Sequence, residues 1–172
     1  MKKWISRLDR LLIILLVALM AILVMLIVWQ VFARYILNDP SSVTEELARF
    51  VLIWTALLGA SYAFRMRMHL GLNLFTQKLK GRHKSLAEFA ALAAVAIFAL
   101  VVMIIGGGRL MLLTADLNQL TAALGIPVAY VYSVLPLSGG LFLIYIAEFC
   151  RELLQSGAIA VADHEREGSD YE

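Results

Sequence analysis

Residues 11–33 read LLIILLVALMAILVMLIVWQVFA, and this stretch decides the fold class of the chain. A helix needs about 20 mostly apolar residues to cross the roughly 30 Å of hydrocarbon in a bilayer, and Gln30 is the one strongly polar residue of this stretch. Three further stretches have comparable length and character, at residues 43–64, 86–107 and 127–149. The sequence therefore predicts an all-α integral membrane protein with four transmembrane helices.

The composition of the whole chain agrees with this class and excludes others. Of 172 residues, 62% are hydrophobic and 16% are charged, whereas soluble domains contain about 45–50% apolar and about 25% charged residues. The net charge of +2, without a basic stripe, predicts no nucleic-acid partner. Cys150 is the single cysteine, so the chain has no internal disulfide framework.

Basic residues precede the first apolar stretch, as they do in a secretory signal peptide. The stretch exceeds the apolar core of about 7–15 residues that such peptides carry, and no small-residue cleavage motif follows it. We therefore expect an uncleaved first span. We divide the chain into a four-span membrane domain at residues 1–150 and an acidic cytoplasmic tail at residues 151–172.

The basic residues predict the orientation, because cytoplasmic loops carry an excess of lysine and arginine. Of the 15 such residues, 12 lie before the first span, between the second and third spans, or after the fourth span. Arg34, Arg49 and Arg109 lie on the opposite side. We expect a multi-pass protein of a bacterial inner membrane, in contact with membrane lipid, with both termini in the cytoplasm.

The centres of the four predicted spans contain no charged residue and no histidine. Ionisable groups at membrane depth are costly and mark ion, proton or substrate pathways. Haem ligation would need axial histidines, and thiol redox chemistry would need a paired cysteine. We therefore expect no enzyme activity, no cofactor, and no catalytic, metal or substrate site in this chain.

Helix caps are predicted where the second and third spans begin. Ser42 and Glu45 have the Ser-x-x-Glu spacing of a capping box, in which each side chain binds a backbone N–H of the first turn. Ser85 and Glu88 repeat this spacing before the third span. A glutamate at a helix N-terminus also suits the helix dipole.

A charged cluster is predicted at the start of the second span. Arg49 follows Glu45 by four residues and Glu46 by three, so the three side chains share one helix face. Arg34, at the end of the first span, lies on the same side of the membrane and extends this cluster. Its members form ion pairs within the chain or polar contacts to a neighbouring helix or partner subunit; ion or substrate binding is the less favoured alternative.

Small residues form a packing face on the second span, because small side chains let membrane helices approach closely. This face consists of Ala56, Gly59, Ala60 and Ala63. Faces of small residues also occur on the third and fourth spans. None of the spans carries candidate catalytic or ligand-binding residues at membrane depth. This pattern predicts a surface for another membrane subunit.

A row of leucines between the third and fourth spans predicts an amphipathic helix, because its members recur at three- and four-residue steps. The row consists of Leu110, Leu113, Leu117, Leu120 and Leu124. We expect this helix to lie in the membrane interface, with the glycines at 106–108 ending or bending the third span. The alternative is that it extends the third span.

The sequence resembles the small membrane subunit of TRAP transporters, the DctQ-like family, over nearly all of residues 1–150. The resemblance rests on Arg34-Tyr35, Glu45-Glu46-Leu47-x-Arg49, Trp54, Gly59, His69 and Gly125-Ile126-Pro127. It implies a non-enzymatic scaffold in a secondary active transporter. A periplasmic solute-binding protein would deliver an organic anion, such as a dicarboxylate, sialic acid or another sugar acid. The large multi-span subunit would hold the Na+ and substrate sites, and this chain would brace it.

The resemblance implies a structural or subunit-contact role for Glu45, Glu46 and Arg49. Two other functions stay open on the residues alone. One is an anchor or assembly subunit of a respiratory or signalling complex. The other is a small homo-oligomeric exporter or channel, which the lack of polar residues at depth disfavours.

Overall fold

The computed structural model describes the backbone of residues 2–39, 41–66 and 82–169, and the side chains of residues 4–39, 41–66 and 89–151. All secondary structure elements in these ranges are helical. In chain order they are α1 (Lys2–Phe32), η1 (Ala33–Leu37), α2 (Ser42–Arg65), α4 (Arg82–Phe98), η2 (Ala99–Gly106), α5 (Gly107–Asp116), α6 (Val128–Tyr132) and α7 (Val134–Ser169). The elements η1 and η2 are π-helical segments that continue α1 and α4 without a break.

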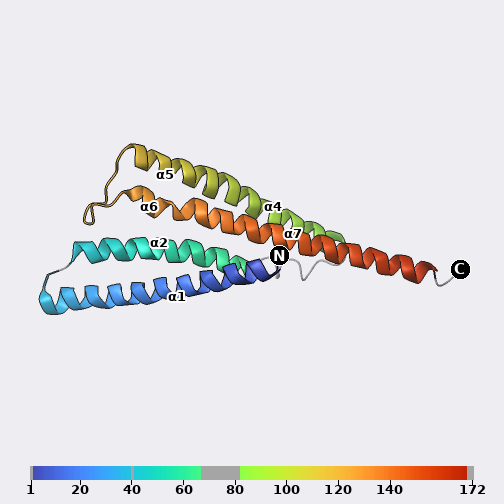
Figure 1. The fold of residues 1–172 in the computed structure, drawn as a ribbon, viewed down its shortest axis with the longest axis horizontal. Coiled ribbons are helices and arrows are strands. Elements are labelled where there is room, and N and C mark those ends of the chain that lie inside the picture. Colours follow the sequence, from blue (N-terminus) through green and yellow to red (C-terminus); the bar gives the residue numbers. More distant parts are fainter. Residues whose placement is uncertain (1, 40, 67–81, 170–172) are drawn as a thin grey trace.

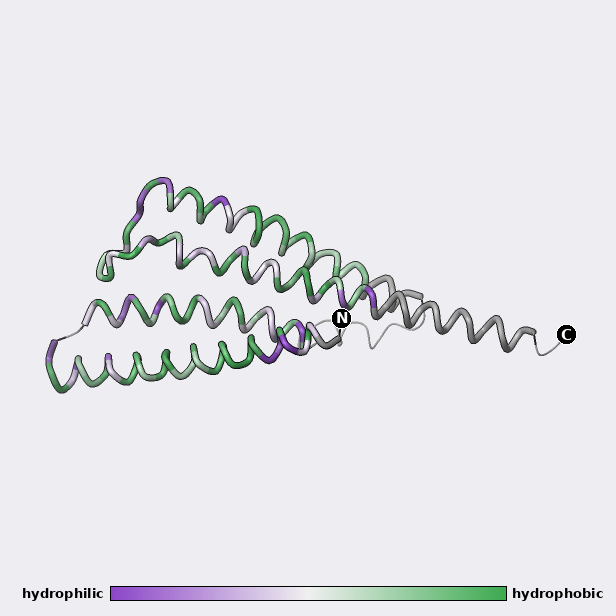
Figure 2. The backbone as a smooth tube through the Cα atoms, in the orientation of Figure 1, coloured by the Kyte–Doolittle hydropathy of each residue, from purple (hydrophilic) through white to green (hydrophobic). Residues whose placement is uncertain are grey.

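Four helical stretches are long and apolar enough to cross a membrane. They are Trp4–Leu37, Ser42–Arg65, Phe89–Asp116 and Val128–Arg151. Figure 2 shows apolar residues along these stretches and hydrophilic residues mainly toward their ends. The predicted all-α membrane fold with four spanning helices is therefore confirmed.

The helices form an open layer rather than a closed bundle. α1 packs on α2, α2 on α7, and α7 on η2, while α5 packs on α6 (Figure 1). Within the described part of the chain, α1 does not contact the third spanning helix. α1 and the continuous α4–η2–α5 helix are therefore the two edges of the layer, and α2 and α7 are its centre.

The core lies where α2 and α7 meet. Phe64 of α2 packs against Phe142 and Phe149 of α7, with ring centroids 5.4 and 5.6 Å apart. A second buried cluster joins Leu12 of α1 to Leu58 of α2. Because each face of a layer has few neighbours, only 11% of the most apolar part of α1 is buried, against 33% for the helix that contains α7.

The third spanning helix continues through the glycines at 106–108 into α5, so these glycines do not end it. Gly107 is buried against α7, where a methyl group would lie 2.6 Å from Leu135 Cβ. Gly139 faces the same contact from α7, where a methyl group would lie 2.9 Å from Met103 Cβ and from Ile104 Cγ1. These glycines serve the close approach of two helices, not a break in one.

The separate amphipathic helix was predicted wrongly. Leu110 and Leu113 belong to α5, which extends the third span, whereas the other three leucines follow the end of α5 at Asp116. These three are Leu117, Leu120 and Leu124. The chain leaves the helix at Asn118, whose φ of 46° is left-handed, and then folds into a compact loop closed by the bridge between Leu120 and Pro127. Side-chain periodicity alone does not detect this reversal.

Neither predicted capping serine lies at the N-cap position of its helix. Ser41, not Ser42, caps α2: its Oγ accepts the Thr44 N–H at 3.5 Å, and Thr44 Oγ1 donates to the Ser41 carbonyl at 3.0 Å. Both serines are good caps, and the extended backbone of Ser41, with φ −81° and ψ 105°, decides between them. α4 is described from Arg82 onward, so Ser85 lies inside the helix.

Glu88 also lies inside α4, and the side chains of Ser85 and Glu88 fall outside the described ones. At the other end of the chain, α7 continues to Ser169. The acidic tail predicted at residues 151–172 therefore starts inside this helix.

Candidate functional site

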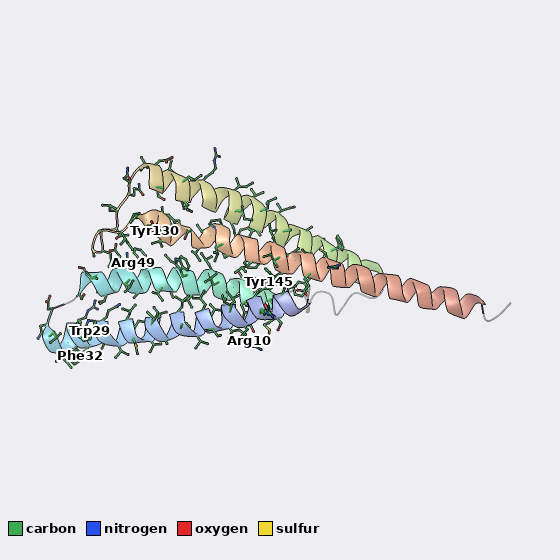
Figure 3. The ribbon with its side chains drawn as sticks, viewed as in Figure 1. Arg10, Trp29, Phe32, Arg49, Tyr130 and Tyr145 are labelled. Atoms are coloured by element: carbon green, nitrogen blue, oxygen red, sulfur yellow. The ribbon has the colours of Figure 1, made fainter. Side chains whose placement is uncertain are left out.

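Polar side chains gather at the two ends of the helix layer. We call Gln30, Arg34, Glu45, Glu46 and Arg49 the Glu46 cluster, and Asp9, Arg65, Tyr145 and Glu148 the Asp9 cluster. Figure 3 labels Arg49 near the end with the α1–α2 connection, and Arg10 and Tyr145 toward the N-terminal end. The apolar lengths of the spans separate the two clusters.

Glu46 holds the loop between α5 and α6. Its carboxylate accepts three consecutive backbone N–H groups: Ala122 at 3.1 Å, Ala123 at 2.8 Å and Leu124 at 2.9 Å. Successive backbone N–H groups that point at one anion form a nest, and hydrogen bonds to a carboxylate are stronger than neutral ones. A side chain of α2 is thereby fastened to a segment more than 70 residues away in the sequence.

The loop presents these N–H groups because it is ordered by its own hydrogen bonds. The N–H of buried Thr121 donates to the Ile126 carbonyl at 2.9 Å, and Thr121 Oγ1 accepts the Ile126 N–H at 3.1 Å. Gly125 closes the turn with a φ of 65°, which a glycine adopts without a steric penalty. Gly125-Ile126-Pro127, one of the motifs on which the family resemblance rests, thus helps to fold the loop whose N–H groups bind Glu46.

A second set of contacts in the Glu46 cluster joins the end of the first span to the start of α2. Arg34 Nη2 lies 3.0 Å from Glu45 Oε1, and Gln30 Nε2 donates to the Thr44 carbonyl at 2.9 Å. The Arg34 and Glu45 side chains are 61% and 43% exposed. Exposed pairs of this kind contribute little to stability, at most about 1 kcal/mol.

Arg49 has a different environment from the rest of the Glu46 cluster. Its side chain is exposed, and none of the carboxylates whose positions are described lies within 4.0 Å of its guanidinium. Glu46, three residues earlier, turns to the loop. The structure thus brings together Arg34 with Glu45 and Glu46 with the loop, and leaves Arg49 at the surface of the layer.

The predicted packing face of α2 is divided between two environments. Gly59 faces α1, where a methyl group would lie 3.8 Å from Leu16 Cδ2. Ala63 is half-buried, whereas Ala56 and Ala60 are exposed. Only part of this face therefore packs within the chain.

The Asp9 cluster joins α1, α2 and α7 and was not predicted. The Tyr145 hydroxyl donates to Asp9 Oδ1 at 2.8 Å, Arg65 Nε lies 3.4 Å from Asp9 Oδ2, and Arg65 Nη2 lies 4.0 Å from Glu148 Oε2. The guanidinium also lies 5.9 Å from the ring centroids of Tyr145 and Phe149, within cation–π range. The sequence does contain a signal for this cluster, because residues of opposite charge lie near the same membrane end of three predicted spans.

The chemistry of the two clusters is that of structural fastening. Among the described residues, no three His, Cys, Asp or Glu side chains lie close enough together to hold a metal ion. The Glu46 carboxylate is engaged by backbone N–H groups, and Asp9 is engaged by Tyr145 and Arg65. The Glu46 cluster links α2 to a loop distant in the sequence, and the Asp9 cluster links α1 and α2 to α7.

Comparison with known proteins gives a family match over most of the chain. Residues 23–156 match the family described as tripartite ATP-independent periplasmic transporters, DctQ component. The chain is 33% identical over 79 residues to the sialic acid TRAP transporter small permease protein SiaQ of Vibrio cholerae, which covers 45% of this chain and 46% of that protein. It is 36% identical over 59 residues to a TRAP transporter small permease protein of Haemophilus influenzae, covering 34% of this chain and 37% of the relative. The aligned segments span less than half of either relative.

Proposed function

The chain belongs to the DctQ family of tripartite ATP-independent periplasmic (TRAP) transporter components, and on this premise we propose that it braces the large membrane subunit of such a transporter. In this proposal the large multi-span subunit moves the substrate, and this chain supplies a helix layer of constant shape beside it. The small-permease names of the two matched relatives support the role of membrane component.

The observation that carries the bracing role is the open layer. Between 11% and 33% of the most apolar part of each spanning helix is buried within the chain, and large side chains such as Met25 and Ile97 are 74% and 64% exposed. Lipid or the helices of another subunit can cover such faces. A layer has two broad faces, so it can present one to a partner and the other to lipid.

The polar clusters support the same role by stiffening the layer. The Glu46 cluster ties the second span to the α5–α6 loop at one end. The Asp9 cluster ties α1, α2 and α7 together at the other end. A brace needs this property, because a helix layer that deformed with its partner could not resist the partner's motion.

We further propose that the transporter takes up an organic acid with Na+, after delivery by a periplasmic solute-binding protein. We place the Na+ and substrate sites in the large subunit, because the carboxylates of Glu45, Glu46 and Asp9 already have partners within this chain. Sialic acid, which appears in the name of the Vibrio cholerae relative, is the first sugar acid to test.

We also propose that the protein lies in the bacterial inner membrane with both termini in the cytoplasm, which places the Glu46 cluster on the periplasmic side. The distribution of lysine and arginine supports this orientation. A reporter at Ser41 should then be accessible from the periplasm, and one at Lys80 from the cytoplasm. Reversed labelling would overturn the orientation.

The bracing role is tested by co-expressing the tagged chain with the large membrane subunit of a TRAP transporter from the same organism. We expect the two to co-purify in mild detergent, and we expect Na+-dependent uptake in proteoliposomes only when both subunits and the binding protein are present. Full uptake by the large subunit and binding protein alone would refute the bracing role. Purification of this chain as a homo-oligomer, or with a redox or signalling protein, would favour the other functions considered above.

A further inference from the structure

A cavity of about 560 Å3 lies beside the Asp9 cluster. One face of α1 forms much of its wall, through Ser6, Arg10 and Ile13, which recur at helical spacing. Arg65 of α2 and Glu148 of α7 complete the wall. The cavity therefore opens where the three helices that carry the Asp9 cluster converge.

The wall contains two cations and two carboxylates, and these four groups differ in the contacts that they make with other residues of the chain. Asp9 accepts from Tyr145 and pairs with Arg65. Glu148 lies 4.0 Å from Arg65, and its buried Oε2 accepts no hydrogen bond from the described residues. The exposed Arg10 guanidinium forms no ion pair with a described carboxylate. One cation and one carboxylate are thus available to a ligand that carries both charges.

The position of the cavity indicates a lipid. Arg10 is the last charged residue before the apolar run of the first span, so the polar wall lies at the level of the lipid headgroups. Ile13 and Ile14 also line the cavity and are 40% and 63% exposed. A ligand held here meets charges at one end and a lipid-facing apolar surface at the other.

We propose that this cavity binds phosphatidylethanolamine, with Arg10 and Ser6 holding the phosphate, Glu148 accepting the ammonium N–H groups, and an acyl chain lying along Ile13 and Ile14. Phosphatidylglycerol has no ammonium to donate to Glu148, so it would leave that carboxylate without the second contact, which disfavours it. The quaternary ammonium of phosphatidylcholine has no N–H to donate to Glu148. This site depends on insertion in a membrane and not on the transporter role.

Lipid competition on the intact protein tests the proposal. The full chain is purified in a neutral detergent, and retained lipid is measured by native mass spectrometry with phosphatidylethanolamine, phosphatidylglycerol and phosphatidylcholine offered at equal concentration. We expect phosphatidylethanolamine to be preferred by about tenfold, the factor for one charge-assisted hydrogen bond. Equal binding of the three lipids, or a preference for phosphatidylglycerol, would overturn the proposal.

Two variants and a matched control locate the site. Arg10→Gln should lower phosphatidylethanolamine binding about tenfold, and Glu148→Gln should remove the preference over phosphatidylglycerol. Arg7→Gln makes the same charge change on an exposed residue of α1 outside the cavity wall, and it should leave binding unchanged. Equal losses in the Arg7 and Arg10 variants would show general surface attraction and would overturn the site.

A soluble headgroup separates a lipid site from a metabolite site. O-phosphoethanolamine has the same phosphate and ammonium but no acyl chains, so it should compete at least about a hundredfold more weakly, since each buried CH2 contributes about 0.8 kcal/mol. Competition at the same concentration as the lipid would contradict a lipid site. Glu148→Gln disturbs the pair with Arg65, so the helix content of this variant is checked by circular dichroism. If Glu148→Gln is unfolded, the binding measured for Arg10→Gln decides the test.

Discussion

The contact between η2, α5 and α7 can be tested with two matched pairs of glycines. Gly139 and Gly140 are neighbours on α7, and so are Gly107 and Gly108 on α5. One member of each pair faces the opposite helix, whereas a methyl group at Gly140 or Gly108 would meet no atom within 4 Å. The four Gly→Ala variants therefore make one chemical change in two environments.

The expected difference within the Gly139 pair follows from the distances. At Gly139 the new methyl carbon would lie 2.9 Å from Met103 Cβ and 3.2 Å from the Ala99 carbonyl oxygen. Both neighbours belong to the backbone or its first side-chain atom, so the helices must separate, and overpacking of this kind costs about 1–3 kcal/mol. Gly139→Ala and Gly140→Ala both gain up to about 1 kcal/mol of helix propensity, which cancels when the two variants are compared. The pair should therefore differ by about 1–3 kcal/mol in the free energy of unfolding.

The assay is reversible unfolding in mixed detergent micelles, followed by circular dichroism, with all variants at the same lipid content. Gly107→Ala should be destabilised in the same way as Gly139→Ala, because its methyl group would lie 2.6 Å from Leu135 Cβ. Gly108→Ala should behave like Gly140→Ala. If the inward and outward members of both pairs have equal stability, the close approach of these two helices is refuted.

Three further predictions concern the polar clusters. Glu46→Gln should speed hydrogen exchange of the backbone amides at 122–124, since a neutral side-chain amide is a weaker acceptor for their three N–H groups than a carboxylate. Unchanged protection factors in exchange mass spectrometry would contradict these hydrogen bonds. Tyr145→Phe keeps the buried ring but removes the donor to a carboxylate at 2.8 Å, so detergent unfolding should show a loss of about 1.5–3 kcal/mol, whereas wild-type stability would show that the bond contributes nothing. Arg49→Ala should lower co-purification of the large subunit and leave the sodium dependence of residual uptake unchanged. The exposed control Arg109→Ala should change neither co-purification nor sodium dependence. Altered sodium dependence in a fully assembled complex would refute the scaffold role.

The four spanning helices were predictable because their signal is local. A run such as residues 11–33 needs no knowledge of its neighbours to be recognised as membrane-spanning. Helix ends were predicted less well. Adjacent Ser41 and Ser42 are equally good caps by residue type, and the leucine row kept a helical period across the point where the chain reverses at Asn118.

The partners of the polar residues could not be predicted from local spacing. Glu46 and Arg49 share a helix face in the sequence pattern, yet Glu46 binds backbone groups 76 to 78 residues further on. Every residue except proline has a backbone N–H group, so no residue pattern near Glu46 indicates that its carboxylate binds the amides of a distant loop. The bond from Tyr145 to Asp9 joins residues separated by 136 positions, and it depends on which helices the layer places side by side.

The two clusters together set the sliding register of α2 against its neighbours. Moving α2 along its axis by one residue would displace it by about 1.5 Å. Such a slide would misalign the Glu46 bonds of 2.8 and 2.9 Å, and at the other end it would shift Arg65 from its position between Asp9 and Glu148. A single fastening would still permit a pivot, but two at opposite ends permit neither a pivot nor a slide. The alignment of α2 therefore depends on polar contacts at its two ends as well as on the apolar packing between them.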